Sequence, residues 1–438
     1  MPRNTNHIIL FLLITILNIG IGISLTHGIV DKEPKVIIAG GGPGGLMTAI
    51  LLSQKGIPTT ILEQSPEPET LSQKSYSINI NERGQEALER AGCLELVQKV
   101  GFVHDSILIV NDKSGAVTPI PLGKGRPSIR LDRPSLCKAL ESVVEENIHV
   151  TMKRGSRVTK IVPSSSSPNS EDELVLQVHL EDGSVLFASH VIGADGKWSN
   201  VRKSCSELES QVSVETEGSF SIQMERLGIP EGWNEELIHI IRPKDGKFYI
   251  MAVPLINQEL SILMICYDEV LKSYPWLAPQ EKLEQNWNDI RDNKAKSDAA
   301  MSLAPKLKDM LEIEAPAFLA AIGEDALKSA RVKHRTPWIN MSNPEGTPGN
   351  YSTRNGRVAL IGDAAHAVVP STGEGCNMAL ESAMRLADSI NFGQGEEPVS
   401  VKALSSGLKT YGSSRPHETL PLQSKAAAAA NYETSRFR

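Results

Sequence analysis

The first residues whose types and spacing could do chemistry form the glycine-rich loop Gly40-Gly41-Gly42-Pro43-Gly44-Gly45. The spacing GxGxxG is the one that dinucleotide-binding loops use to hold a pyrophosphate. The first glycine allows a tight turn, the second lets the backbone approach the phosphates, and the third lets the next helix pack closely. That helix then offers unpaired N–H groups and a positive dipole end to the phosphates. We therefore predict that the loop binds a cofactor through Gly40, Gly42, Pro43, Gly44 and Gly45.

An acidic residue completes this pattern at Glu63, which lies 23 residues after Gly40. A carboxylate at this distance accepts hydrogen bonds from the ribose of an adenosine. Because an acid suits an unphosphorylated ribose, the pattern favours FAD or NAD over NADPH in this loop. The sequence has no second fingerprint of this kind and no redox cysteine pair, which disfavours the two-dinucleotide disulfide reductases.

The elements that must position these residues follow in the order strand, helix, strand. Lys35–Ala39 is a short apolar, β-branched run that is typical of a buried parallel strand, and it leads directly into the loop. Residues 46–55 read as a helix that ends at Gly56, a plausible C-cap. A second strand, Thr59–Leu62, ends at Glu63. This order predicts a Rossmann-like unit.

Two further turns lie far downstream. The apparent strand His190–Gly193 runs into Gly193-Ala194-Asp195-Gly196, and the strand Arg357–Ile361 ends in Gly362-Asp363-Ala364-Ala365-His366. The stretch from Pro370 to Asn377 then opens an apparent helix. Taken alone, each turn also fits an ordinary junction between a strand and a helix.

Composition bounds the class of protein. The 438 residues leave room for two or three domains, and 40% hydrophobic with 22% charged residues indicates a folded globular chain. The formal net charge of −7 disfavours a general nucleic-acid binder. The five cysteines are scattered and form no CxxC or Cys/His cluster, so we expect neither a disulfide framework nor a metal site.

The first 34 residues are set aside as a signal peptide or membrane anchor. Ile8–Leu25 is an uncharged, mostly apolar run of 18 residues. As a helix it would span roughly 27 Å, which is the short end for a membrane. It also fits a signal peptide cut after Thr26-His27-Gly28, and a buried core helix ranks last. We expect a membrane-associated, secretory-pathway or organelle-targeted protein, with an orientation that the flanking charges leave open.

Together the glycine turns resemble a known family, the single-component FAD-dependent aromatic hydroxylases. These are flavoprotein monooxygenases of the p-hydroxybenzoate hydroxylase fold, and the resemblance runs from Lys35 to about Tyr432. Ser77–Gly84 and Leu360–Asn377 are similar to the kynurenine 3-monooxygenase branch. Arg133, in Asp132-Arg133-Pro134-Ser135-Leu136, matches the family's arginine near the flavin chain.

The resemblance implies an α/β fold, in which a Rossmann-like FAD-binding domain carries an inserted, mainly antiparallel β-sheet substrate domain. The FAD-binding parts would be residues 35–112, 128–212 and 346–438, and the substrate parts 113–127 and 213–345. In the larger insertion we predict strands at Leu237–Ile241, Phe248–Leu255 and Ser261–Tyr267, a hairpin turn at Asp245-Gly246, and helices around Gln280–Ala300 and Pro305–Ile322. The alanine run Ala426–Ala430 reads as helix.

The resemblance also implies roles for single residues. Asp363, beside Gly362, would hydrogen-bond the ribityl or ribose part of FAD, while Asp195 and Gly196 would lie near the pyrophosphate and help NADPH or NADH to dock. Five residues would lie under the pyrimidine side of the flavin, where a helix N-terminus stabilises the charge of the reduced ring: Pro370, Gly373, Gly375, Cys376 and Asn377. No side chain is expected to be catalytic, His366 and Cys376 included, because the flavin carries the oxygen chemistry.

The implied activity is a hydroxylation that consumes NAD(P)H and O2. Reduced FAD would form a C4a-hydroperoxide, whose distal oxygen passes to an electron-rich aromatic or related apolar small molecule. Kynurenine hydroxylases carry an arginine just before the Ser-Ile-Asn run, where this chain has Tyr76, a candidate for the substrate pocket. A neutral or phenolic substrate fits beside a tyrosine more easily, although Lys74 or Arg126 could replace the arginine.

Two alternatives stay open at this point. The first is an FAD-dependent epoxidase or reductase that acts on an isoprenoid lipid at a membrane, which would give the apolar N-terminus a purpose. The second is an FAD-binding protein without turnover, because intact cofactor motifs argue for retained binding and not for retained chemistry.

Overall fold

The computed structural model describes residues 35–68, 77–112, 114–122, 125–164, 175–215, 219–243, 247–255, 258–277, 293–333, 338–342, 347–368, 373–391 and 399–435. All of them belong to one compact unit, Pro34–Arg438. The apolar run Ile8–Leu25 lies outside the described residues. Within the described ranges, no helix combines the length and apolarity needed to cross a membrane.

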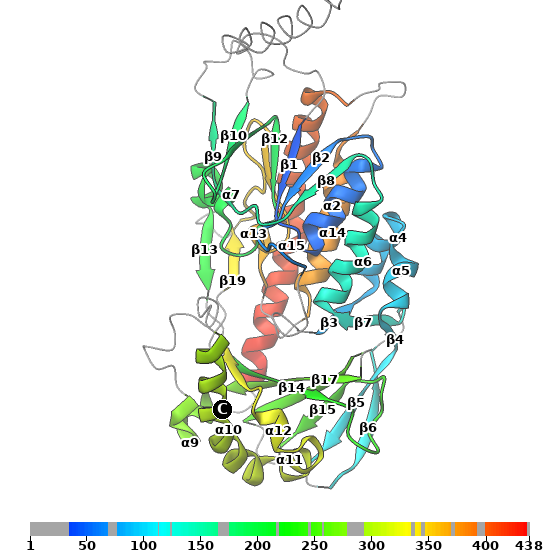
Figure 1. Cartoon of the computed structure of the whole chain (residues 1–438), viewed down its shortest axis with the longest axis vertical. Coiled ribbons are helices and arrows are strands. Elements are labelled where there is room, and N and C mark those ends of the chain that lie inside the picture. The colour runs from blue at the N-terminus through cyan, green and yellow to red at the C-terminus, as the bar shows by residue number, and fades with distance from the viewer. Residues whose placement is uncertain are drawn as a thin grey trace, which may run out of the picture. The chain divides into compact units, whose positions relative to one another are not determined.

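A five-stranded parallel sheet forms the centre of the nucleotide-binding half (Figure 1). Its order is β20 (Val358–Leu360), β12 (His190–Gly193), β1 (Val36–Ala39), β2 (Thr59–Leu62) and β8 (Val150–Lys153). The three neighbours β20, β12 and β1 are short runs buried on both faces, as a parallel sheet with both faces covered requires. The predicted strands and their order along the chain are confirmed.

Helices cover this sheet and complete its core. α2 (Pro43–Ser53) packs against α6 (Arg133–Glu145) and α14 (Gly375–Ser389), and Figure 1 shows the three side by side. The 35-residue α15 (Val401–Ser435) packs on α14 and β20 and contains the predicted helical run Ala426–Ala430. Smaller elements surround this core: α4 (Glu82–Arg90), α5 (Leu94–Lys99), α7 (Asn200–Lys203), α8 (Ser206–Glu209) and α13 (Asp363–His366).

Three small antiparallel sheets decorate the nucleotide-binding half. They are β3 (Ser77–Ile80), β7 (Ser128–Asp132) and β4 (Phe102–His104); β9 (Val158–Pro163), β10 (Leu176–Leu180) and β11 (Val185–Ala188); and β13 (Val212–Glu215) with β19 (Trp338–Met341). The first of these sheets lies nearest the site, because β7 leads directly into the helix that begins at Arg133.

The inserted domain is built on a seven-stranded sheet. Its order is β18 (Arg331–Lys333), β14 (Ser219–Leu227), β17 (Glu259–Tyr267), β16 (Phe248–Pro254), β15 (His239–Arg242), β5 (Ser106–Asn111) and β6 (Val117–Pro121). All neighbours are antiparallel except β15 and β5. The three predicted strands are confirmed as β15, β16 and β17, and the predicted turn at Asp245-Gly246 lies outside the described residues.

The first insertion begins earlier than predicted. We placed its start at residue 113, but β5, which begins at Ser106, already pairs with β15 in the substrate sheet. The polar turn that follows Asn111 is the tip of the β5–β6 hairpin, closed by the bond from Asn111 N–H to Ala116 C=O at 2.9 Å. A turn within one sheet was thus interpreted as a domain boundary.

The helices that pack on the substrate sheet also begin and end at residues other than those predicted. α10 (Asn293–Glu314) runs through Pro305, where we had placed a helix start, and α11 (Pro316–Ile322) begins after Ala315. Ala315 has φ −148° and ψ 60°, outside the helical region, which the residue before a proline avoids. With α12 (Glu324–Leu327), these helices share a core with one face of the sheet, while α9 (Asp268–Ser273) and a short 3₁₀ turn (Pro275–Leu277) follow β17.

Candidate active site

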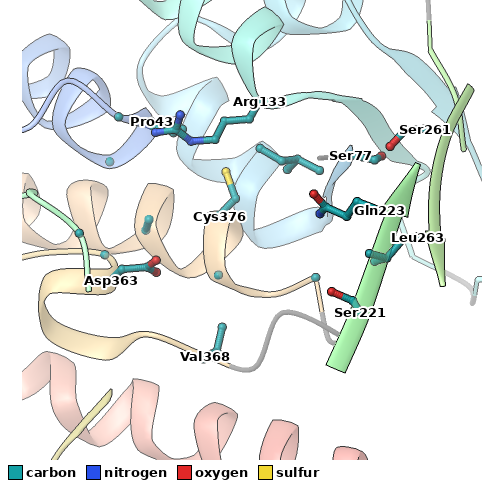
Figure 2. A pocket seen from close by; sticks show the side chains of 18 of the residues that line it. Pro43, Ser77, Arg133, Ser221, Gln223, Ser261, Leu263, Asp363, Val368 and Cys376 are labelled. Atoms are coloured by element: carbon teal, nitrogen blue, oxygen red, sulfur yellow. The ribbon is translucent and has the colours of Figure 1, made fainter. Parts of the chain in front are cut away.

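A cavity of about 440 Å³ lies between the two halves of the fold. On one side the chain leaves the carboxyl ends of β1, β12 and β20, and on the other lie strands β14, β16 and β17. Figure 2 shows Arg133, Cys376 and Asp363 on the nucleotide-binding side, facing Ser221 and Gln223 across the space. The carboxyl edge of a parallel sheet is where α/β proteins bind their ligands.

Most of the predicted cofactor residues meet at this cavity. Its lining includes Gly42, Pro43, Gly44, Arg133, Gly196, Gly362, Asp363, Gly373, Gly375 and Cys376. Five predicted residues are not part of that lining, namely Gly40, Gly45, Glu63, Asp195 and Asn377. Pro370 and Tyr76 lie outside the described residues.

The glycine loop is shaped by two close backbone contacts. Gly40 has φ +105°, and a Cβ there would lie 2.3 Å from the carbonyl oxygen of Ala194. A Cβ on Gly45 would lie 2.0 Å from the carbonyl oxygen of Gly40. No side chain caps α2, whose first residue is Pro43, so its N-terminal dipole is directed at the cavity. The loop therefore offers backbone, not side chains, to a ligand.

The carboxylate of Glu63 lies against the same loop. Its Oε2 accepts a hydrogen bond from Gly41 N–H at 2.7 Å, and its Oε1 accepts one from Ser65 N–H at 2.8 Å. These bonds fix the carboxylate at the end of β2, where the sequence pattern had placed it. Its contact with a ribose stays a prediction.

Comparison with known proteins decides the family. The profile of the FAD binding domain family matches residues 33–305 and 320–418 of the chain. The chain belongs to this FAD-binding family. It is 26% identical over 369 residues to the kynurenine 3-monooxygenase of Dictyostelium discoideum, covering 80% of this chain and 68% of the relative. It is 23% identical to 3-hydroxybenzoate 6-hydroxylase 1 of Aquipseudomonas alcaligenes, over 91% of this chain and 89% of the relative.

A solved structure confirms the fold of this FAD-binding protein. Klebsiella pneumoniae HpxO, complexed with FAD and uric acid, matches 92% of this chain and 89% of its own at a TM-score of 0.67 and 19% identity. The predicted α/β fold, the family and the class of FAD-dependent monooxygenase are therefore confirmed. The roles of single residues must be argued from their geometry.

The nucleotide-binding side of the cavity fits FAD. The uncapped start of α2 and the Arg133 guanidinium beside it supply positive potential where a pyrophosphate would lie. A Cβ on Gly42 would lie 3.0 Å from Arg133 Nη2, so the glycine leaves room for that arginine. α14 also begins without a side-chain cap, at Gly375, and gives a second positive helix end for a flavin ring.

Asp363 is the acid that faces the cavity. It stands in the first turn of α13, where one side of its side chain is open to the cavity and protein surrounds the other sides. The surrounding protein removes water from the carboxyl and so raises its pKa, while the nearby positive charges of Lys197 and Arg133 oppose this rise. A carboxylate in such a place can accept hydrogen bonds from sugar or ribityl hydroxyls.

Asp195 and Asn377 support the site from behind. Asp195 Oδ2 accepts hydrogen bonds from the N–H groups of Asn200 at 2.7 Å and Val201 at 3.1 Å, so its carboxylate holds the turn that carries Gly196. Asn377 Oδ1 accepts from Asn81 N–H at 3.0 Å, which ties α14 to the chain after β3. These bonds give both residues a positioning role, and their predicted contact with the cofactor stays a prediction.

Cys376 and His366, which the sequence analysis did not expect to be catalytic, are poor candidates for catalysis because of their surroundings. Burial raises the pKa of the Cys376 thiol to about 12, so a thiolate is not available near neutral pH. His366 is buried, bonds to Ser382 Oγ at 2.8 Å, and has its pKa lowered to about 3 by burial and by the charge of Arg415. It therefore stays neutral inside the core.

Arg202 joins the two turns that line the cavity. Its guanidinium is buried and donates to the carbonyl oxygens of Ala364 at 2.6 Å and Lys197 at 2.9 Å, and to Glu209 Oε2 at 2.8 Å. These carbonyls neighbour Asp363 and Gly196. The sequence places Arg202 after the second glycine turn, but nothing local in it indicates this bridge.

Removing this bridge should weaken both the fold and the site. We expect Arg202→Ala to lower the free energy of unfolding by about 2 kcal/mol, because buried acceptors lose their donors. FAD affinity should also fall, since the two turns lose their common anchor. Urea unfolding and FAD titration measure the two effects. Arg157→Ala is the control, because its pair with Glu181 at 3.4 Å is exposed, and an equal loss in both variants would contradict the bridge.

Sequence reasoning predicted a substrate sheet but named none of the residues with which this sheet lines the cavity. β14 contributes Ser221 and Gln223, and β17 contributes Ser261, Leu263 and Ile265. The alternating residues Ile222 and Met224 point instead into the core with α10 and α11. An alternation of polar and apolar residues along 219–227 was the available signal, but it does not say which partner each face meets.

Proposed function

We propose that this protein hydroxylates an aromatic or related apolar small molecule, with NADPH or NADH as electron donor and O2 as oxidant. The observation that carries the proposal is a cavity in which residues suited to FAD face a sheet surface whose described lining is uncharged. A substrate on that surface would lie next to the flavin. The names of its relatives, a kynurenine 3-monooxygenase and a 3-hydroxybenzoate 6-hydroxylase, support a ring-shaped substrate.

The residues of this chain would bind, orient and exclude water. FAD, when bound, supplies the hydride and oxygen chemistry. The start of α2 with Arg133 would hold its pyrophosphate, Asp363 its hydroxyls, and the start of α14 its ring. On the opposite side, Met251 and Leu263 give an apolar surface that displaces water from the reacting centre.

The test is a spectrum followed by oxygen uptake. The purified full-length protein should carry FAD, and it should consume O2 with NADPH or NADH when one of a panel of aromatics is added. A protein that stays colourless with added FAD would contradict the whole proposal. Donor oxidation without oxygen uptake would instead identify a reductase, and product analysis separates hydroxylation from epoxidation.

We also propose that Ile8–Leu25 brings the enzyme to a membrane or into a secretory or organellar compartment. Its 18 uncharged, mostly apolar residues support this. Mass spectrometry of the mature N-terminus separates the two forms: loss of the first 28 or so residues indicates a signal peptide. An intact N-terminus in a protein that fractionates away from membranes would refute both.

A further inference from the structure

Four polar side chains that line the cavity have no hydrogen-bond partner among the described residues. Ser77, Ser221, Gln223 and Ser261 all line the cavity, and Figure 2 shows Gln223 between Ser221 and Ser261, facing Cys376. Within the described residues, none of the four side chains makes a hydrogen bond. Polar groups in a cavity of this kind are normally satisfied by a ligand or by water.

The next polar side chain on this face of β14 lies outside the cavity lining and does have a partner. Glu225 follows Gln223 on the same face of β14, outside the cavity lining, and its Oε1 is bonded to Arg331 Nη2 at 3.2 Å. Ser329 Oγ donates to the Glu225 carbonyl oxygen at 3.1 Å. On this face of β14, Glu225 is therefore paired outside the cavity, while Gln223, which lines the cavity, makes no side-chain hydrogen bond among the described residues.

Charge is distributed unevenly around the cavity. Arg133 and Asp363 both lie on the nucleotide-binding side, with Arg133 Nη2 only 3.0 Å from where a Cβ on Gly42 would lie. The lining residues of β14, β16 and β17 that the structure describes include no Lys, Arg, Asp or Glu. A substrate carboxylate on the sheet side would be desolvated without a cation, which is costly.

We propose that the substrate is an uncharged ring compound with an amide-type group, a carboxamide or lactam, and that Gln223 determines specificity by binding it. The side-chain amide of glutamine offers one acceptor oxygen and two N–H donors, which match the donor and acceptor of such a group. Met251, Val253 and Leu263 supply the apolar surface for the ring. This inference rests on the proposed function and specifies its substrate.

Matched pairs of ring compounds test it on the full-length, FAD-loaded enzyme. The probes are 3-hydroxybenzamide with 3-hydroxybenzoate, 2-aminobenzamide with 2-aminobenzoate, and 6-hydroxynicotinamide with 6-hydroxynicotinate. Dissociation constants come from the change in flavin absorbance. In at least one pair, the amide should bind about tenfold more tightly than the acid, because the described lining of β14, β16 and β17 offers the acid no cation.

Three variants assign the preference to Gln223. Gln223→Leu should reduce it to about threefold or less, because the amide loses its partner. Gln223→Glu, which keeps nearly the same size, should weaken the binding of the acids further, because the two carboxylates repel each other. Gln177→Leu, in the β9–β10–β11 sheet away from the cavity, should change nothing. FAD occupancy of each variant shows whether it is folded.

Other outcomes overturn the inference. Tighter binding of the acids, no binding of any amide, or a preference that survives Gln223→Leu each contradict it. The proposed function is judged separately by bound FAD and by oxygen uptake in the wild-type protein. An enzyme that takes up oxygen with acids alone would keep the function and lose the amide substrate.

Discussion

Replacing Asp363 by alanine should raise the dissociation constant of FAD by about 100-fold. A charge-assisted hydrogen bond contributes roughly 1.5–3 kcal/mol, and Asp363 is the carboxylate of the described lining that faces the cavity. Fluorescence titration of the FAD-free protein measures the effect. Asp388→Ala is the matched control, because that exposed aspartate pairs with Arg90 on the surface at 3.5 Å.

Although replacing Asp363 should weaken FAD binding, it should not lower the stability of the FAD-free protein. Because burial raises the pKa of Asp363 above its ordinary value, the ionised carboxyl disfavours the folded state. The penalty grows as pH rises from the ordinary aspartate pKa, about 3.9, to the raised one, and it is complete above that. Asp363→Asn should therefore be at least as stable as the wild type at pH 7, with the difference fading as pH falls.

These opposed signs separate binding from structure. A residue that mainly holds the fold together loses stability and affinity together when it is replaced. If Asp363→Ala unfolds in less urea than the wild type at pH 7, its carboxylate belongs to the scaffold. If FAD affinity stays unchanged, the assignment to the ribityl or ribose hydroxyls is wrong.

The sequence could predict the nucleotide-binding side because its signals are local. The glycine spacing, the acid at Glu63 and the turn before Asp363 each depend on a few neighbouring residues. Parallel strands then bring these turns to one edge, since β1, β12 and β20 are neighbours in the sheet. Residue types alone could not tell that Asp195 turns its carboxylate inward to Asn200 N–H.

The substrate side could not be predicted because it depends on tertiary packing. Whether Gln223 or Ile222 faces the cavity is decided by which face of β14 packs on α10 and α11. The start of the first insertion was misplaced for the same reason, since only pairing with β15 reveals that β5 belongs to the substrate sheet. Local pattern gives the periodicity of a strand but not the partner of either face.

A pair of adjacent glycines gives the sharpest test of how the cofactor loop is built. Gly44 and Gly45 are both buried in the first turn of α2. A Cβ on Gly44 would meet Ala379 Cβ at 3.5 Å, which is ordinary contact, whereas one on Gly45 would lie 2.0 Å from the Gly40 carbonyl oxygen. Alanine stabilises a helix by about 1 kcal/mol relative to glycine. Both substitutions therefore gain this helix stabilisation, and they differ only in whether the new Cβ clashes with the backbone.

Gly44→Ala should therefore leave the free energy of unfolding of the FAD-free protein unchanged or slightly higher. Gly45→Ala should lower it by about 3 kcal/mol, because backbone must move to relieve the overlap. Urea unfolding followed by far-ultraviolet circular dichroism measures both. Equal stabilities would mean that α2 can withdraw from β1 at little cost. In that case the glycine at position 45 serves only the approach of the cofactor, and its replacement should lower FAD affinity without changing stability.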